Sequence, residues 1–274
     1  MTYKIVALDL DGTLLNSQHI IRSDTVDALE QVRERGLKIV IVTGRHHVAA
    51  HAYHDQLKLD TPIICCNGAY VFNYDKSEAI AATPLEPEKA LRLLEISRTY
   101  KVHNFVYLKD AMTFETEDEH VRNLLAWSHT LPERVRPVIR HLRNFEEEIE
   151  QGPTIWKIVV SHPDPSVLSA CISHMKEAVC ASYEWSWHNL VDIVRAGNSK
   201  GARLAEWTRS QGVDLAQVVA IGDNDNDISM LSQAGLGIAM GNATAGAKAA
   251  AGFVTGGNDG DGIASALRRF VLER

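Results

Sequence analysis

The chain has 274 residues, which is enough for one large domain or two smaller ones. Its composition, 45% hydrophobic and 23% charged, is typical of a globular protein with a sizeable core, and no apolar run is long enough to cross a bilayer. The formal net charge of −7 and the absence of a basic run argue against a nucleic-acid partner. Asp9 and Asp11 interrupt the apolar run near the N-terminus before a secretory signal could form, so we expect a cytoplasmic protein.

The first third of the chain predicts strands that alternate with helices. Short buried runs predict strands at residues 4–8, 37–42 and 63–66. Apolar positions from Ser23 onward recur at helical spacing, and Gly36 stands where a C-terminal helix cap belongs. A second helix is expected to end near Leu57.

The last third of the chain has the same organisation. Strands are expected at residues 218–221, 237–240 and 253–254. An alanine-rich helix is expected from about Thr244, and an amphipathic helix over residues 263–272. This alternation favours an α/β fold with a doubly wound, Rossmann-like parallel sheet covered by helices on both faces.

The middle of the chain has a different pattern. Its strand candidates, at residues 105–108, 156–161 and 183–187, are separated by long polar stretches with helical character. We therefore expect an inserted α+β cap domain over residues 83–189. The catalytic core would then be discontinuous and consist of residues 1–82 and 190–274.

Polar residues follow the strands of the predicted sheet, where ligands bind in open parallel sheets. They are Asp9, Asp11, Thr43, Gly44, Asn67 and the acidic run 223–227. Several carboxylates at one edge disfavour one another's ionisation unless a cation is present, and oxygen ligands without clustered His or Cys indicate Mg²⁺. A calcium-binding EF-hand loop from Asp223 is excluded, because Ile228 and Ala234 stand where glycine and glutamate are required.

Four short segments, in chain order, resemble the four motifs of the haloacid dehalogenase superfamily. They are Asp9-Leu10-Asp11-Gly12-Thr13, Thr43-Gly44-Arg45, Asn198-Ser199-Lys200-Gly201 and Gly222-Asp223-Asn224-Asp225-Asn226-Asp227. The large insertion between the second and third motifs is similar to that of Cof-type phosphatases, and the likeness covers nearly the whole chain. The resemblance implies a hydrolase of phosphate esters, since relatives without the second aspartate tend to be ion pumps or dehalogenases.

The resemblance also implies a role for each motif residue. Asp9 is expected to be the nucleophile that forms an aspartyl-phosphate, and Asp11 the general acid–base group. Mg²⁺ is expected on the Asp9 and Asp223 carboxylates and the Asp11 backbone carbonyl, with Asp227 orienting these ligands. The phosphoryl oxygens are expected to be held by the Thr43 hydroxyl, the Leu10 and Gly44 amides, Lys200 and Asn226.

The expected substrate is a small phosphorylated metabolite. Residues 42–49, 65–68 and 184–188 resemble most closely those members of the group that act on pyridoxal phosphate. Pyridoxal 5′-phosphate is therefore the leading hypothesis, and a sugar-phosphate phosphatase of broad specificity is the alternative. A binding regulator without turnover and a phosphomutase are further hypotheses, and the intact pair of aspartates argues against the regulator.

Five aromatic residues outside the motifs are candidates for substrate specificity. Trp185, Trp187 and His188 precede the return to the core, where they could stack on a pyridine ring or pack the core of the cap itself. His46 and His47 follow the phosphate-binding turn, and each could contact a substrate hydroxyl or be an ordinary helix residue.

Two further positions near the motifs are expected to be structural. Arg45 is expected to form an ion pair and not to touch phosphate. Asn67 and Gly68 are expected to shape the rim near the hinge of the cap.

Overall fold

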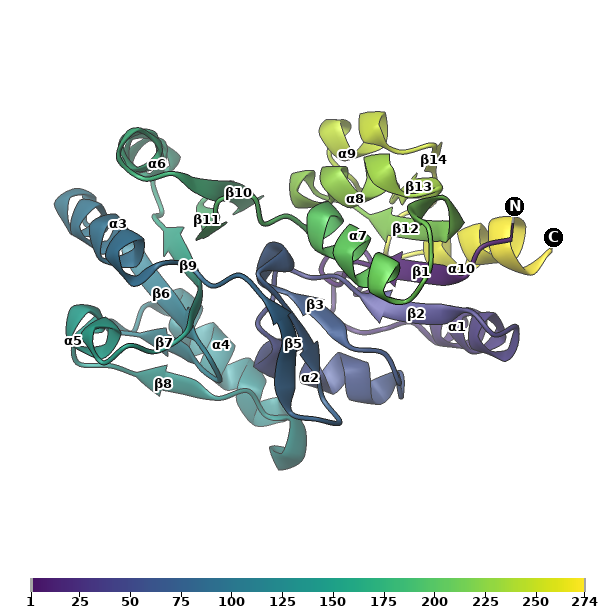
Figure 1. The fold of residues 1–274 in the computed structure, drawn as a ribbon, viewed down its shortest axis with the longest axis horizontal. Coiled ribbons are helices and arrows are strands. Elements are labelled where there is room, and N and C mark those ends of the chain that lie inside the picture. Colours follow the sequence, from purple (N-terminus) through teal and green to yellow (C-terminus); the bar gives the residue numbers. More distant parts are fainter. Residues whose placement is uncertain (1, 274) are drawn as a thin grey trace.

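A five-stranded sheet forms the centre of one lobe of the computed structural model, which describes residues 2–273 except for the side chain of Trp187 (Figure 1). All neighbouring strands of this sheet are parallel, in the order β14-β13-β12-β1-β2. The strands are β1 (Ile5–Leu8), β2 (Lys38–Ile41), β12 (Val218–Gly222), β13 (Leu236–Ala239) and β14 (Phe253–Val254). The strands predicted for these segments are confirmed.

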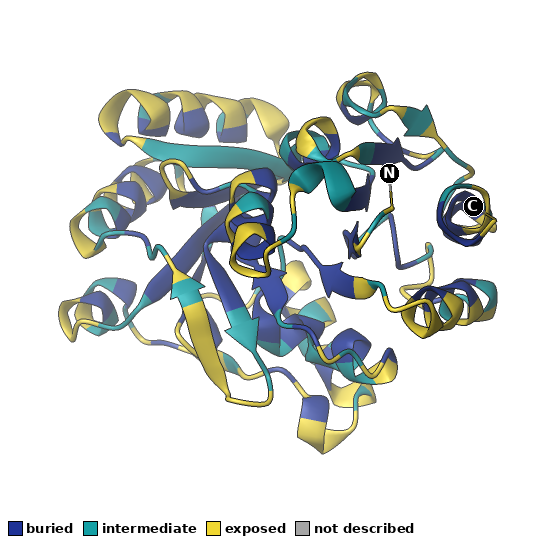
Figure 2. Cartoon of the chain, turned by 45° about the vertical axis from the view of Figure 1, so that its right-hand side comes forward, coloured by how far each residue is buried: buried dark blue, intermediate teal, exposed yellow. Residues whose placement is uncertain are grey.

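Helices cover both faces of the parallel sheet, so the predicted α/β class is confirmed. On one face α1 packs against α10 and the π-helical turn η5, and on the other α8 packs against α7 and α9. The helices are α1 (Ser23–Glu34), α2 (His47–Gln56), α7 (Lys200–Ser210), α8 (Ile228–Gln233), α9 (Ala245–Ala250) and α10 (Gly262–Leu267), followed by η5 (Arg268–Leu272). Figure 2 shows buried strands between helices whose outer surfaces are exposed.

The register of the sheet brings distant residues to one edge. Leu8 at the end of β1 lies opposite Ile41 of β2 and Ile221 of β12. All four residues of β1 are fully buried, as expected for a parallel strand with helices on both sides. The residues that follow β1 and β12 therefore meet at the same edge of the sheet.

A small antiparallel sheet lies beside β2, and it was only partly predicted. The expected strand at residues 63–66 is β3 (Ile63–Cys65), which pairs with β4 (Tyr70–Asn73), and β4 pairs with β5 (Glu78–Ala82). A 3-10 turn, η1 (Cys66–Gly68), joins β3 to β4. The hairpin of β4 and β5 was missed because β5 is mostly exposed and alanine-rich, with little of the β-branched character that marks a strand.

A second lobe contains a six-stranded sheet in the order β10-β11-β9-β6-β7-β8 (Figure 1). Its strands are β6 (His103–Leu108), β7 (Met112–Phe114), β8 (Ile139–His141), β9 (Ile155–Ser161), β10 (Ala181–Trp187) and β11 (Leu190–Arg195). Every pair is antiparallel except β7 with β8. The strands expected at residues 105–108, 156–161 and 183–187 correspond to β6, β9 and β10.

Helices pack on both faces of this second sheet. Helices α3 and α6 contact each other over one hydrophobic cluster, while Val121 of α4 belongs to a separate cluster on the opposite face. The elements are α3 (Pro87–Tyr100), α4 (Glu119–Thr130), α5 (Phe145–Glu150), α6 (Pro165–Ala178) and the 3-10 turn η2 (Glu133–Val135). Within residues 2–273, no helix combines the length and apolarity needed to cross a membrane.

The second lobe extends beyond the boundary predicted at residue 189. Strand β11 was expected to belong to the core, but it pairs with β9 and β10 of the six-stranded sheet. The two chain connections between the lobes lie side by side, because the Asn198 side-chain amide donates to the Thr83 carbonyl at 2.9 Å. We refer below to residues 83–195 as the inserted lobe.

Candidate active site

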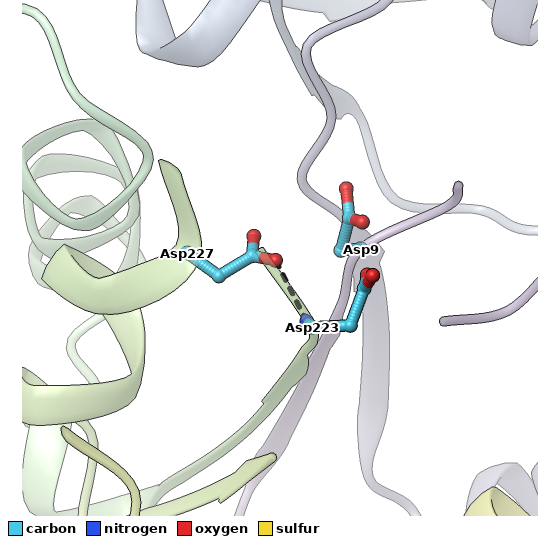
Figure 3. Close-up of side chains that lie close together, drawn as sticks. All are labelled: Asp9, Asp223 and Asp227. Atoms are coloured by element: carbon cyan, nitrogen blue, oxygen red, sulfur yellow. Dashed lines mark hydrogen bonds between the residues drawn. The ribbon is translucent and has the colours of Figure 1, made fainter. Parts of the chain in front are cut away.

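Three aspartates gather at the carboxyl edge of the parallel sheet (Figure 3). Asp9 directly follows β1, Asp223 directly follows β12, and Asp227 ends the 3-10 turn η4 (Asp225–Asp227). One carboxylate oxygen of each lies within 4.8 Å of the other two. Asp9 and Asp227 are buried and Asp223 is half-buried, so their negative charges need compensation from nearby cations.

Lys200 supplies part of this compensation. It is the first residue of α7, and its Nζ atom lies 2.7 Å from Asp9 Oδ1 and 2.6 Å from Asp227 Oδ1. Burial alone would favour the neutral amine, but the Asp227 and Asp9 carboxylates raise the pKa of Lys200 above its usual value. One ammonium group beside three carboxylates leaves an excess of negative charge.

The hydrogen bonds of the cluster show where a cation fits. Both oxygens of Asp227 are engaged, Oδ1 by Lys200 and Oδ2 by the backbone amides of Asp223 (2.9 Å) and Asn224 (3.0 Å). In the described part of the chain, Oδ2 of Asp9 and Oδ2 of Asp223 accept no hydrogen bond. These two hard oxygen donors suit a small divalent cation. The bond from the Asp223 amide to Asp227 is compatible with the orienting role expected for Asp227, which stays a prediction.

The pKa values of the two candidate ligands reflect the same crowding. Burial, reinforced by Asp227, raises the pKa of Asp9 well above its usual value. Burial likewise raises the pKa of Asp223 to about 6, although the Thr13 hydroxyl acts in the opposite direction. A bound cation would favour the ionised form of both carboxylates.

Thr13 donates a hydrogen bond to Asp223, and Gly12 leaves space for its carboxylate. Neither role was predicted. Thr13 Oγ1 donates to Asp223 Oδ1 at 2.7 Å. Gly12 has φ +78°, and a Cβ atom at this position would collide with the Asp223 carboxylate. The motif therefore needs glycine both for its backbone conformation and for the space that Asp223 occupies.

Asp11 lies apart from the three-aspartate cluster and forms an ion pair. Arg45 donates through Nε to Asp11 Oδ2 (2.7 Å) and through Nη2 to Asp11 Oδ1 (2.6 Å), which bears out the predicted ion pair. Although burial acts in the opposite direction, Arg45 lowers the pKa of Asp11. Asp11 is therefore ionised in this arrangement, and the acid role expected for it would require it to leave Arg45 and take up a proton.

The residues expected to bind phosphate follow strands that end at the same edge of the sheet as Asp9. Thr43 and Leu10 are buried, and Gly44 follows Thr43 in the turn after β2. Among the residues that the structure describes, neither the Leu10 amide nor the Gly44 amide donates to a protein acceptor, so both are available to an anion. Asn226 bonds Asn67 through its amide nitrogen (3.1 Å).

The two histidines after the turn of Thr43, Gly44 and Arg45 make internal contacts. His46 is completely buried, and its Nε2 atom lies 2.8 Å from the Leu108 carbonyl of the inserted lobe. His47 stacks on Phe72 with 3.7 Å between ring centroids, and its Nδ1 atom lies 2.9 Å from the Tyr70 hydroxyl. These contacts account for the burial of both rings, and substrate contact stays a prediction.

The aromatic residues of β10 and its turn lie in different surroundings. Trp185 is half-buried against the hydrophobic cluster between α3 and α6, which favours the packing interpretation for this residue. His188 is exposed in the turn between β10 and β11. The side chain of Trp187 lies outside what the structure describes.

The sequence and the fold agree with those of known hydrolases. Residues 6–267 match the family described as haloacid dehalogenase-like hydrolase, and the chain belongs to this family. It is 44% identical to the pyridoxal phosphate phosphatase YbhA of Escherichia coli (strain K12), over 99% of this chain and 100% of that protein.

Two solved structures of the same superfamily have closely similar folds. A haloacid dehalogenase-like hydrolase from Bacteroides thetaiotaomicron superposes with a TM-score of 0.84 at 28% identity, over 98% of this chain and 99% of that chain. The sugar phosphatase BT4131 of subclass IIB has a TM-score of 0.82 at 26% identity, over 97% and 98% of the two chains. Because each comparison covers nearly the whole of this chain, the fold similarity includes both lobes.

Gly12→Ala should weaken cation binding at the cluster. The new methyl group would displace the Asp223 carboxylate, and loss of such support typically lowers metal affinity roughly 10- to 100-fold. Calorimetric titration with Mg²⁺ measures this effect. Gly36→Ala is the matched control, because Gly36 also has a positive φ (+81°) but has open space around its Cβ position. Equal Mg²⁺ affinities in the two variants would contradict a cation site at the Asp223 carboxylate.

Protonation of His46 and His47 should destabilise the fold in acid. Burial lowers their pKa values from 6.5 to about 3 and about 2, so below pH 6.5 the unfolded chain binds more protons than the folded one. The free energy of unfolding should then fall as pH drops from 6.5 to 5, by up to about 1.4 kcal/mol per pH unit for each histidine. His47→Phe should reduce this slope in urea titrations, and an unchanged slope would refute the explanation.

Proposed function

We propose that this protein is a Mg²⁺-dependent phosphomonoesterase that works through an aspartyl-phosphate on Asp9. The observation that carries the proposal is the surroundings of Asp9. Its buried carboxylate lies beside Lys200 and close to the Asp223 carboxylate. At the same edge of the sheet, the Leu10 and Gly44 amides have no protein acceptor among the described residues. This combination offers a nucleophile together with donors for the oxygens of a phosphoryl group.

In the first step, a carboxylate oxygen of Asp9 attacks phosphorus and the bond from phosphorus to the ester oxygen breaks. Before this step Asp11 leaves Arg45 and takes up a proton from solvent. The ester oxygen leaves with the bonding electrons and takes this proton from Asp11. Negative charge on the three phosphoryl oxygens is stabilised by Lys200, by the amides of Leu10 and Gly44, and by the Thr43 and Asn226 side chains.

In the second step, water attacks the phosphorus of the aspartyl-phosphate. Asp11 accepts the proton of this water, the bond from phosphorus to the Asp9 oxygen breaks, and inorganic phosphate leaves. The Asp9 and Asp223 carboxylates and the Asp11 carbonyl would hold Mg²⁺, with Asp227 orienting them. Bound Mg²⁺ supplies positive charge to the phosphoryl oxygens and keeps Asp9 ionised.

The substrate we propose is pyridoxal 5′-phosphate. The 44% identity to a pyridoxal phosphate phosphatase over the full length of both proteins supports this substrate. A sugar phosphate is the second candidate, which the fold similarity to a sugar phosphatase of subclass IIB supports. In either case, the inserted lobe would act as a cap that excludes water and contacts the part of the substrate beyond the phosphate.

Asp9→Asn should abolish phosphate release, because an amide is a poor nucleophile. Removal of Mg²⁺ by EDTA should also abolish it, because the negative charge of the phosphoryl oxygens then loses its main counter-charge. Purified protein is assayed for inorganic phosphate released from pyridoxal 5′-phosphate and from a panel of hexose and pentose phosphates. Full activity of Asp9→Asn would refute the mechanism.

The same panel separates the two substrate hypotheses. We expect the highest kcat/KM with pyridoxal 5′-phosphate. A markedly higher kcat/KM with a hexose phosphate would overturn this substrate and leave the phosphatase mechanism in place.

Asp11→Asn should affect substrates according to their leaving groups. Removal of the proton donor should lower kcat by roughly 100-fold or more for an alkyl phosphate. For p-nitrophenyl phosphate the leaving group needs no proton, so formation of the aspartyl-phosphate should be much less affected. Rapid-quench measurement of the aspartyl-phosphate formed in the first turnover tests this difference. An equal loss of its rate of formation for both substrates would argue against Asp11 as the acid.

A further inference from the structure

A buried ion pair lies on the face of the inserted lobe that meets the parallel-sheet lobe. Lys157 of β9 and Asp192 of β11 are 3% and 2% exposed, and Lys157 Nζ lies 2.9 Å from Asp192 Oδ1. Tyr107 pairs with Lys157 in the sheet, and the ammonium lies 4.6 Å from the centroid of its ring. Burial would favour the neutral amine, but Asp192 raises the pKa of Lys157 to about 12, so the lysine is charged. Such a pair is weak evidence for a stabilising role, because desolvation offsets its attraction.

The lysine of this pair reaches the phosphate-binding turn. Lys157 Nζ donates to the Gly44 carbonyl at 2.8 Å. The amide on the other side of that peptide group, Arg45 N–H, donates to Thr43 Oγ1 at 3.0 Å. The Thr43 oxygen therefore acts as an acceptor within the turn, and its own proton stays available for a phosphoryl oxygen. The peptide group that orients Thr43 is thus held from the inserted lobe.

The aspartate of the pair reaches the other side of the site. Asp192 Oδ2 accepts from the Asn67 amide nitrogen at 2.8 Å. A carboxylate can only accept, so this bond fixes the orientation of the Asn67 amide and turns its oxygen toward Asn226. Asn226 donates to that oxygen at 3.1 Å, which leaves a second hydrogen on the same nitrogen.

These two series of hydrogen bonds end at Thr43 and Asn226. Both side chains are expected to bind phosphate. We propose that Lys157 and Asp192 are positioning residues, which orient Thr43 and Asn226 for phosphate only when the inserted lobe is seated on the parallel-sheet lobe. This inference rests on the proposed function, because it takes the phosphate site to lie at Asp9. Seating of the inserted lobe and tight binding of phosphate are then coupled.

A second contact between the lobes provides a matched control. Arg134 of η2 forms an ion pair with Asp55 of α2, with Nη2 at 2.7 Å from Asp55 Oδ2. This pair also joins the inserted lobe to the parallel-sheet lobe. However, Arg134 is exposed, and no hydrogen bond in the described residues links this pair to Thr43 or Asn226. Loss of this pair weakens the contact of the lobes without disturbing the phosphate donors.

The test uses the double variant Lys157→Met/Asp192→Leu, which removes both charges and so leaves no uncompensated charge buried. Binding of inorganic phosphate in the presence of Mg²⁺ is measured by calorimetry, beside kcat and KM for phosphate release. We expect phosphate affinity and kcat/KM to fall roughly 10- to 100-fold, while the affinity for Mg²⁺ alone is unchanged. Arg134→Ala should stay within about twofold of the unmodified protein in all three measurements.

Asn67→Gly is the second variant, for the case that the double variant does not fold. Asn67 has φ +52°, which glycine adopts without strain, and this change cuts the link to Asn226 but keeps the buried ion pair. We expect a similar loss of phosphate affinity. Unchanged phosphate affinity in Asn67→Gly, or a loss in Arg134→Ala as large as in the double variant, overturns the inference.

The outcomes also separate this inference from the proposed function. If the unmodified protein releases no phosphate from any ester but binds inorganic phosphate, and the variants weaken this binding, the positioning role stands and the proposed function fails. If turnover is normal in the unmodified protein and phosphate affinity is the same in all variants, the function stands and the positioning role fails.

Discussion

The arrangement of side chains at the end of β1 depends on the compensation of negative charge. Asp9 and Asp227 are buried beside each other and beside Asp223, and carboxylates this close oppose one another's ionisation. Lys200, which is 1% exposed, is held between Asp9 and Asp227 and can only satisfy part of this charge. The site is therefore arranged for a further cation, and the backbone amides around Asp227 fix the geometry in which that cation would be bound.

Much of the parallel-sheet lobe could be predicted, because its strands are short buried runs followed directly by polar residues. β1, β2 and β12 carry this signal, and the motif residues at their ends followed from resemblance to a known family. β11 was placed in the wrong lobe, because its sequence pattern reports burial but not which sheet it joins. The pairing of β7 with β8 depends on contacts distant in sequence and has no local signature.

The residues missed at the site are those whose role depends on a partner far along the chain. Thr13 is an ordinary turn residue until β12 brings Asp223 beside it. Lys157 and Asp192 did leave a signal. Each is a charged residue flanked on both sides by apolar residues of its strand, and alternation assigns it to the face opposite its neighbours. Their pairing across β9 and β11, and their contacts with Gly44 and Asn67, required the structure.

The strand order has a consequence for folding of the chain during translation. β1 pairs with β2 and β12, and β12 is synthesised only after the whole inserted lobe. The inserted lobe has its own hydrophobic clusters and can fold while β1 still lacks one neighbour. Asp9 therefore acquires the neighbours contributed by β12 only late in translation, after the sequence of the inserted lobe has been completed.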